Sequence, residues 1–287
     1  HVKLCRRRTA DHQLFHERRS ARRTPGIPQH RPGQHGALPI ARAGNPAAVC
    51  ILDKWLNGKT MQSIAAENNL AETAFIVPAD QHFEIRWFTP AVEVDLCGHA
   101  TLASAFVLFE CLGYQEPEIS FFSPKSGDLK VSKQKDMLFL DFPADTLQKS
   151  DSVDRIQKCI GTKPSEVFKG KTDFIAVLQN ESEVQNLVPD FHEISKLEAR
   201  GLIVTAVGND VDFVSRFFAP QSGIDEDPVT GSAHTSLIPL WTDKLGKNKM
   251  IARQLSKRGG TIFCTNRGDR CLIGGKAKLY LSGEIYI

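Results

Sequence analysis

Two segments more than a hundred residues apart share one plan, and this repetition constrains the fold more strongly than any other feature of the chain. In the first segment, Arg86-Trp-Phe-Thr-Pro90 leads through an acidic loop to Gly98-His99-Ala100 and an apolar helix. In the second, Arg216-Phe-Phe-Ala-Pro220 leads in the same way to Gly231-Ser232-Ala233. Because the matched residues occupy the same strand, loop and helix context, we predict a pseudo-twofold duplication with a cleft between its halves.

The apolar segments indicate that each half is a mixed α/β unit in which a sheet wraps around one central helix. In the first half the sequence predicts strands at 45–52, 72–78 and 82–90, helices at 59–69 and 98–112, and further closing strands. The second half repeats this order, with a central helix that begins at Gly231. A polar linker after DFPAD indicates the boundary, so we predict one domain over residues 44–150 and a second over residues 151–287.

Residues 1–43 differ from the rest of the chain. They carry ten Lys or Arg residues against two carboxylates, and they show almost no hydrophobic periodicity. We predict a basic, mostly unstructured extension. An RNA-binding arm or an Arg-rich targeting peptide remains an alternative for this segment. The remaining chain is mildly acidic, which argues against a nucleic-acid groove as the main function.

The composition indicates a soluble, cytoplasmic protein. With 41% hydrophobic and 24% charged residues, the chain has no apolar run as long as the ~18–20 residues that a membrane helix needs. Its seven cysteines are odd in number and widely scattered, which is typical of reduced thiols. The Cys97-Gly98-His99 triplet has no second pair at zinc spacing, so we expect neither a metal nor another cofactor.

The repeats can carry chemistry because each loop ends at a glycine and the following helix presents unpaired amides and the positive end of its dipole. Two such helix starts that face one cleft suit a carboxylate or an oxyanion. Glu72 and Asp227 are then candidates for proton transfer, and His99 at a helix start would have its pKa lowered by the dipole. Each residue also has a structural interpretation: a solvated turn carboxylate for Glu72, an N-cap for Asp227, and a helix-start histidine for His99.

The motifs GNPAAVC, NNLAETAFI, RWFTPAVEVDLCGHATLASA, FFAP and EDPVTGSAHT together resemble the PhzF-like (phenazine biosynthesis-like domain) family, and look closest to its animal branch. The resemblance runs from about Gly44 to the C-terminus. It implies a diaminopimelate-epimerase-like fold with two similar α/β domains and an active site between them. Members are isomerases that need no cofactor and are often dimeric, so a homodimer is expected.

The resemblance also implies roles for individual residues. The family's acid/base glutamate falls on Glu72, which moves a proton between carbons of the substrate. The other candidates are His99 and Asp227 as catalytic residues, and Asn45, Gly98, Gly231 and Ser232 as substrate-binding residues. Related epimerases use one cysteine from each half, but the second motif here has Thr230 and no thiol. A single carboxylate is therefore preferred over two-thiol racemisation.

One departure from the family concerns the start of the chain. Family members usually open with a strand ahead of the GNPAAV motif, and residues 1–43 do not resemble it. One interpretation is an aberrant segment, from a mistranslated or alternatively spliced start; in that case we expect a missing core strand in the first domain, with an exposed hydrophobic edge next to it.

Two functions remain from the sequence. The leading hypothesis is a cofactor-independent isomerase that acts on a small carboxylated metabolite. The alternative is a non-catalytic scaffold that keeps the fold and binds a protein partner. Neither hypothesis involves a membrane or, in its main function, a nucleic acid.

Overall fold

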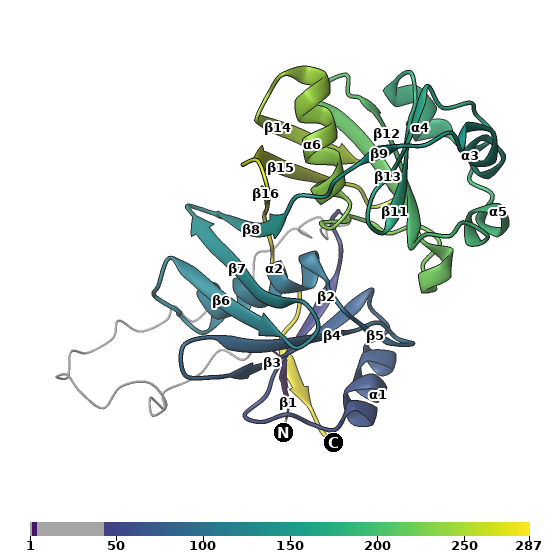
Figure 1. Cartoon of the computed structure of the whole chain (residues 1–287). Coiled ribbons are helices and arrows are strands. Elements are labelled where there is room, and N and C mark those ends of the chain that lie inside the picture. The colour runs from purple at the N-terminus through teal and green to yellow at the C-terminus, as the bar shows by residue number, and fades with distance from the viewer. Residues whose placement is uncertain (1, 5–42) are drawn as a thin grey trace, which may run out of the picture.

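The computed structural model describes residues 2–4 and 43–287, and these residues form two lobes (Figure 1). Their strands belong to one hydrogen-bonded sheet, in which β8 (Met137–Pro143) of the first lobe pairs antiparallel with β16 (Arg270–Gly275) of the second. This pairing joins the lobes along one continuous ladder.

The first lobe is built around a central helix. The helix α2 (Gly98–Phe106) continues as one π-helical turn, Val107–Cys111, and contacts β2, β3, β7 and β8. On the other side of the sheet, α1 (Gly58–Asn68) packs over β3 with its own apolar cluster. The strands of this lobe besides β8 are β1 (Val2–Leu4), β2 (Ala47–Ile51), β3 (Glu72–Pro78), β4 (Phe83–Phe88), β5 (Glu93–Val94), β6 (Glu118–Ser123), β7 (Gly127–Gln134) and β17 (Gly283–Ile285).

The second lobe follows the same plan. The helix α6 (His234–Leu245) packs against β15 and β16, while α3 (Val153–Ile160), α4 (Glu181–Asn186) and α5 (Phe191–Ser195) cover the opposite side. A second apolar cluster lies under these three outer helices. The strands besides β16 are β9 (Gln148–Lys149), β10 (Glu166–Lys169), β11 (Asp173–Val177), β12 (Gly201–Val207), β13 (Phe213–Phe218), β14 (Lys249–Gln254) and β15 (Gly260–Asn266).

Strand pairing confirms the predicted duplication. In the first lobe β2 is parallel to β3, β3 is antiparallel to β4, and β4 is parallel to β6, which begins an antiparallel meander to β8. In the second lobe β11, β12, β13 and β14 repeat these directions, and the meander ends at β16. The fold is therefore the expected α/β duplication, with a sheet around a central helix in each half.

The two repeats also share an ion pair that holds the loop between strand and helix. Arg86 makes a bidentate contact with Glu93, at 2.7 and 2.8 Å, and its guanidinium lies 5.3 Å from the centre of the Phe88 ring. Arg216 does the same with Glu226, at 2.7 and 3.1 Å. Each glutamate precedes the glycine of its repeat, Gly98 or Gly231, by five residues, so the ion pair fixes the loop that positions that glycine.

The two ends of the chain correct the predicted organisation. Val2–Leu4, within the segment expected to be unstructured, forms β1 beside β2, where a missing strand was expected. Apart from these three residues and Ala43, the 1–43 segment lies outside the described residues. The last strand, β17, pairs with β1, so it belongs to the first lobe and not to the predicted second domain. The position of the boundary near residue 150 stays a prediction.

Two helices begin or end differently from their predicted bounds. The helix α6 begins at His234 and not at Gly231, because residues 231–233 form a tighter turn in which the His234 amide donates to the Gly231 carbonyl. The α-helical part of α2 ends at Phe106, six residues earlier than predicted, and the π-helical turn supplies most of the remainder. No helix in the described part of the chain is long and apolar enough to span a membrane.

Candidate active site

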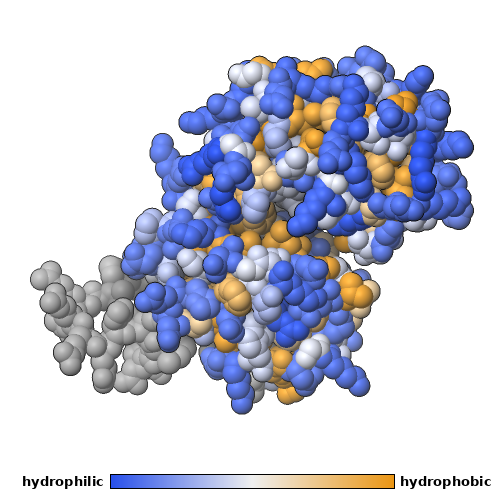
Figure 2. Space-filling model, viewed as in Figure 1, coloured by the Kyte–Doolittle hydropathy of each residue, from blue (hydrophilic) through white to orange (hydrophobic). Residues whose placement is uncertain are grey.

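The starts of the two repeats meet between the lobes, at the glycines Gly98 and Gly231. A Cβ atom on either glycine would lie 3.6 Å from the Cα of the other, so the backbones themselves are in contact. The space-filling view is hollowed where the lobes meet (Figure 2). The amides at the start of α2 have no acceptor one turn earlier, because the helix begins there. These groups are available to a ligand in the cleft.

Glu72 and His99 form the first polar contact of the site. Glu72 is the first residue of β3 and is only 8% exposed, and His99 lies in the first turn of α2. The Nε2 atom of His99 lies 3.0 Å from Oε2 of Glu72. The angles do not suit a hydrogen bond, so Oε2 and Nε2 both keep hydrogen-bonding capacity among the described residues. A buried carboxylate and an imidazole in this arrangement can exchange a proton with a ligand.

The other nitrogen of His99 faces Cys97, with its Nδ1 atom 3.5 Å from Sγ. Burial opposes a positive charge on His99, but the sulfur of Cys97 and the carboxylate of Glu72 outweigh it and hold the pKa of His99 well above its usual range. Burial also raises the pKa of the Cys97 thiol, although the neighbouring imidazole of His99 acts against it. The lowered pKa expected for His99 from the helix dipole is therefore wrong.

Asn45 links the two lobes across the site. Its Nδ2 donates to Oδ1 of Asp227 at 2.8 Å and to the Val229 carbonyl at 3.0 Å, and it lies 3.2 Å from Nδ1 of His99. The two shorter contacts use both hydrogens of Nδ2, which leaves Nδ1 of His99 to interact with Cys97. The Oδ1 atom of Asn45 is buried and has no partner among the described residues. It is an acceptor that a ligand can satisfy.

Asp227 is held by a buried polar network of the second lobe. The Thr230 hydroxyl donates to Oδ2 of Asp227, and Nε2 of Gln254 donates to the Asp227 carbonyl at 2.7 Å. Burial is the main cause that raises the pKa of Asp227, although His99 and the hydrogen bond from Thr230 act against it. The sequence did not indicate Gln254, because this residue ends β14 and its role depends on the packing of β14 beside the 227–230 turn.

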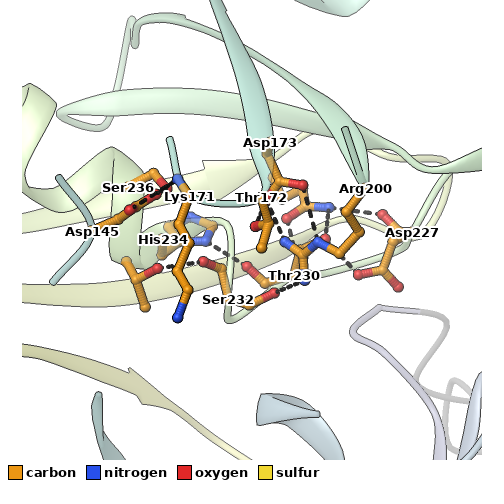
Figure 3. Close-up of polar contacts among 12 residues, drawn as sticks. Asp145, Lys171, Thr172, Asp173, Arg200, Asp227, Thr230, Ser232, His234 and Ser236 are labelled. Carbon is orange, nitrogen blue, oxygen red and sulfur yellow. Dashed lines mark hydrogen bonds and ion pairs between the residues drawn. The ribbon is translucent and has the colours of Figure 1, made fainter. Parts of the chain in front are cut away.

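Ser232 contacts an arginine that the sequence analysis missed. The Nη1 atom of Arg200 donates to Oγ of Ser232 at 2.9 Å, and the other side of the guanidinium makes a bidentate contact with the buried carboxylate of Asp173 (Figure 3). Arg200 directly precedes β12 and Asp173 begins β11, two adjacent parallel strands. Only this strand pairing brings the two residues together, and no local motif marks them.

Three potential metal ligands also lie close together in the site. The ligand atoms of Glu72, Cys97 and His99 all lie within 4.8 Å of one another. However, Glu72 approaches Nε2 of the imidazole and Cys97 approaches Nδ1. Since the lone pairs of the two ring nitrogens point apart, one ion cannot bind all three side chains in these orientations. The arrangement suits proton transfer through the imidazole better than coordination of a metal.

The residues singled out by the sequence do converge. Glu72, His99, Asn45 and Asp227 form one chain of contacts, Gly98 and Gly231 touch beside it, and Ser232 directly follows Gly231. Arg200, Thr230 and Gln254 join this set from the structure alone.

Comparison with known proteins identifies relatives over most of the chain. A family profile described as "Phenazine biosynthesis-like protein" matches residues 40–283. An uncharacterised isomerase of Pseudomonas aeruginosa is 48% identical over 244 residues, which is 85% of this chain and 93% of that protein. A human phenazine biosynthesis-like domain-containing protein is 40% identical over 84% of this chain and 93% of its own length. The expected preference for the animal branch is therefore wrong, because this bacterial relative is more similar.

Solved structures agree with the observed architecture. The crystal structure of a phenazine biosynthesis protein of the PhzF family from Enterococcus faecalis is 45% identical, with a TM-score of 0.83 over 87% of this chain and 96% of that chain. A hydroxyproline epimerase from Agrobacterium vitis is 12% identical, with a TM-score of 0.53 over 84% of this chain and 89% of that chain. The second likeness shows a shared fold alone.

Proposed function

Because the chain belongs to the phenazine biosynthesis-like (PhzF) family, we propose that it is an isomerase that moves a proton between two carbons of a small carboxylated metabolite, with Glu72 as acid and base. The isomerase class is supported by three bacterial relatives, 41–49% identical, that are named as isomerases. The single-glutamate mechanism and the absence of a cofactor are part of the proposal.

The contact between Glu72 and His99 carries the proposal. A base that removes a proton from carbon must be shielded from water and must retain a free lone pair, and Oε2 of Glu72 is buried with no hydrogen bond from the described residues. The neighbouring imidazolium balances the negative charge of the carboxylate before the proton is taken. When Glu72 accepts the proton, this imidazolium can stabilise the negative charge that passes to the substrate.

The other residues would position the substrate. Its carboxylate would lie on the free amides at the start of α2 and of the turn at 231–233, where the positive end of the helix dipole favours an anion. Asn45, fixed by Asp227 and Val229, would accept a hydrogen bond from the substrate through Oδ1. The carboxylic acid of Glu72 can then return the proton to another carbon, provided that the substrate stays bound within reach of Oε2.

The test is incorporation of solvent deuterium into a pool of small carboxylic metabolites, followed by mass spectrometry. The native protein should label at least one metabolite, and Glu72→Gln should abolish labelling, because the amide keeps the shape of the side chain but cannot accept the proton. Cys111→Ser provides a control at a partly exposed thiol on the π-helical turn, remote from Glu72 in the sequence. Equal labelling by the native protein and Glu72→Gln would contradict the proposal.

A non-catalytic scaffold remains the second candidate. It would predict that no metabolite is labelled and that partner binding survives Glu72→Gln. The buried groups without partners in the site weigh against it, because a scaffold gains nothing from burying Oε2 of Glu72 and Oδ1 of Asn45 unsatisfied.

A further inference from the structure

The strand registers show which residue of the second lobe occupies the place of Glu72. Phe88 and Phe218 end the matched Arg-aromatic-Phe motifs, and they pair with Thr73 and Leu202 respectively. The residue before Thr73 is Glu72, so its counterpart in the second lobe is Gly201. Arg200 directly precedes that counterpart. The second lobe thus carries a guanidinium beside the position where the first lobe carries its candidate base.

The contacts repeat as well as the positions. In the first lobe His99, which follows the helix-start glycine, contacts Glu72 at 3.0 Å. In the second lobe Ser232, which follows the other glycine, contacts Arg200 at 2.9 Å. The residue after the glycine therefore contacts the candidate base in the first lobe, and in the second lobe it contacts an arginine that lies one residue before the counterpart of that base.

The structure fixes Arg200 on three sides, although about a third of its side chain, 34%, is exposed. Asp173, only 1% exposed, accepts hydrogen bonds from Nε and Nη2 of the guanidinium, and Oγ of Ser232 accepts one from Nη1. The guanidinium also lies 5.1 Å from the centre of the Phe217 ring. A side chain at position 201 would displace that ring, since a Cβ there would come within 2.7 Å of it. The absence of a side chain at Gly201 thus leaves room for the Phe217 ring, against which the guanidinium of Arg200 packs.

Arg200 and Ser232 keep hydrogen-bond donors that no described residue uses. A guanidinium has five N–H groups, and the described residues use three of those of Arg200. Ser232 accepts from Arg200 through Oγ, and its own hydroxyl hydrogen has no acceptor among the described residues. Spare donors on a preorganised guanidinium suit a planar anion such as a carboxylate.

We propose that Arg200 and Ser232 form a subsite for a second carboxylate of the substrate, so that the preferred substrates are dicarboxylates. This inference rests on the proposed function, which places the first carboxylate on the amides beside Gly98 and Gly231. Ser232 is the neighbour of Gly231, and adjacent Cα atoms are about 3.8 Å apart, so a short carbon chain can bridge the two places. Asp173 is a positioning residue that orients the guanidinium and does not touch the substrate.

Binding of two simple probes tests this subsite without any need for turnover. Succinate and propionate differ by one carboxylate, and isothermal titration gives their dissociation constants. The native protein should bind succinate at least about tenfold more tightly, as expected for one charge-assisted bidentate contact. Arg200→Lys keeps the positive charge opposite Asp173 but loses the planar guanidinium. It should therefore weaken the binding of succinate several-fold and leave the binding of propionate unchanged. Equal binding of the two probes by the native protein would overturn the proposal.

Loss of the arginine alone could unfold the lobe, because it would leave the buried carboxylate of Asp173 unpaired. The double variant Asp173→Asn with Arg200→Gln removes both charges together and should abolish the preference for succinate. Lys130→Gln is the matched control, since it removes an exposed cation that pairs with Glu118 in the first lobe. It should leave both constants unchanged. Equal weakening of succinate by the control would contradict a local subsite.

Inorganic phosphate serves as the third probe. If phosphate binds as tightly as succinate and is weakened equally by Arg200→Lys, the place is a general anion site and the inference of a dicarboxylate is wrong. The outcome for Glu72→Gln separates the two proposals. A preference for succinate that persists in Glu72→Gln supports the subsite, even if deuterium labelling shows that the proposed isomerisation fails.

Discussion

Gly98 and Gly231 touch backbone to backbone, with a Cβ atom on either one lying 3.6 Å from the Cα of the other. Neither glycine has the positive φ that would by itself require glycine. Space, and not backbone conformation, is therefore the reason that each repeat has a glycine at this point. The two glycines let the two lobes approach each other beside Glu72 and His99.

This contact predicts that Gly98→Ala and Gly231→Ala do not act independently. Each single change should alter the free energy of unfolding by about 1 kcal/mol or less, because one added methyl group meets atoms at 3.3 Å or beyond. The double variant places two methyl groups in one gap, so its loss should exceed the sum of the single losses by at least about 1 kcal/mol. Urea unfolding of the three variants measures the difference. A loss in the double variant equal to the sum of the two single losses would show that the backbones of Gly98 and Gly231 are farther apart.

The Glu72–His99 contact predicts a shift in the titration of His99. Its pKa in the folded protein is raised, so the contact contributes stability that is fully present below the unfolded pKa of about 6.5 and is lost as pH rises through the folded pKa. Glu72→Gln should lower the pKa of His99 and reduce this pH dependence. Imidazole resonances followed by NMR measure both proteins, with the exposed His192 of the second lobe as an internal reference. An unchanged titration of His99 in Glu72→Gln would show that the carboxylate does not support the imidazolium.

The burial of a second histidine, His234, predicts that the free energy of unfolding falls in acid. His234 is fully buried, its Nδ1 donates to the Thr230 carbonyl at 2.8 Å, and burial lowers its pKa to about 4. The unfolded chain therefore takes up a proton at a higher pH than the folded chain does. The stability gained from keeping His234 neutral is present above about pH 6.5 and is lost as pH falls toward about 4.

The loss from this one group should amount to about 3 kcal/mol. His234→Asn keeps a donor near Nδ1 and removes the titration, so its unfolding free energy should change less between pH 7 and pH 4.5 than that of the native protein. Urea unfolding at the two pH values provides the comparison. Equal pH dependence in the two proteins would assign the acid sensitivity to other groups.

The repeated Arg–Glu pairs predict unequal costs in the two lobes. The side chain of Arg216 is 11% exposed and also donates to the Val184 and Leu187 carbonyls, whereas that of Arg86 is 25% exposed. Glu226→Gln should therefore lower the free energy of unfolding by about 3 kcal/mol, and Glu93→Gln by about 1 kcal/mol. Guanidinium unfolding of the two variants tests the order. A larger loss for Glu93→Gln would contradict the difference in burial.

The repeated motifs made the architecture and much of the site predictable. The Arg-aromatic-Phe-x-Pro segments and the two glycines recur with their local context, so each lobe could be inferred from sequence, and Glu72, His99 and Asp227 could be named within motifs. Arg200 and Gln254 could not, because their contacts depend on strand register and on residues 24 to 32 positions away. The pKa of His99 was mispredicted for a similar reason: the helix dipole is local, but Glu72 approaches from another strand.

The strand formed by Val2–Leu4 shows the same limit. Three residues carry little periodicity, and their partners in β2 and β17 lie more than 40 and more than 270 residues away. The start of α6 was placed too early because a glycine followed by small residues suits both a helix and the tighter turn at 231–233.

The pairing of β17 with β1 has a consequence for how the protein is made. A ribosome releases the first lobe's central strands early, but the strand that completes its edge follows the whole second lobe in the sequence. The second lobe, from β9 to β16, is contiguous in sequence and is released before that strand. We therefore expect the second lobe to complete its own pairing before β17 joins β1, so the edge of the first lobe closes last.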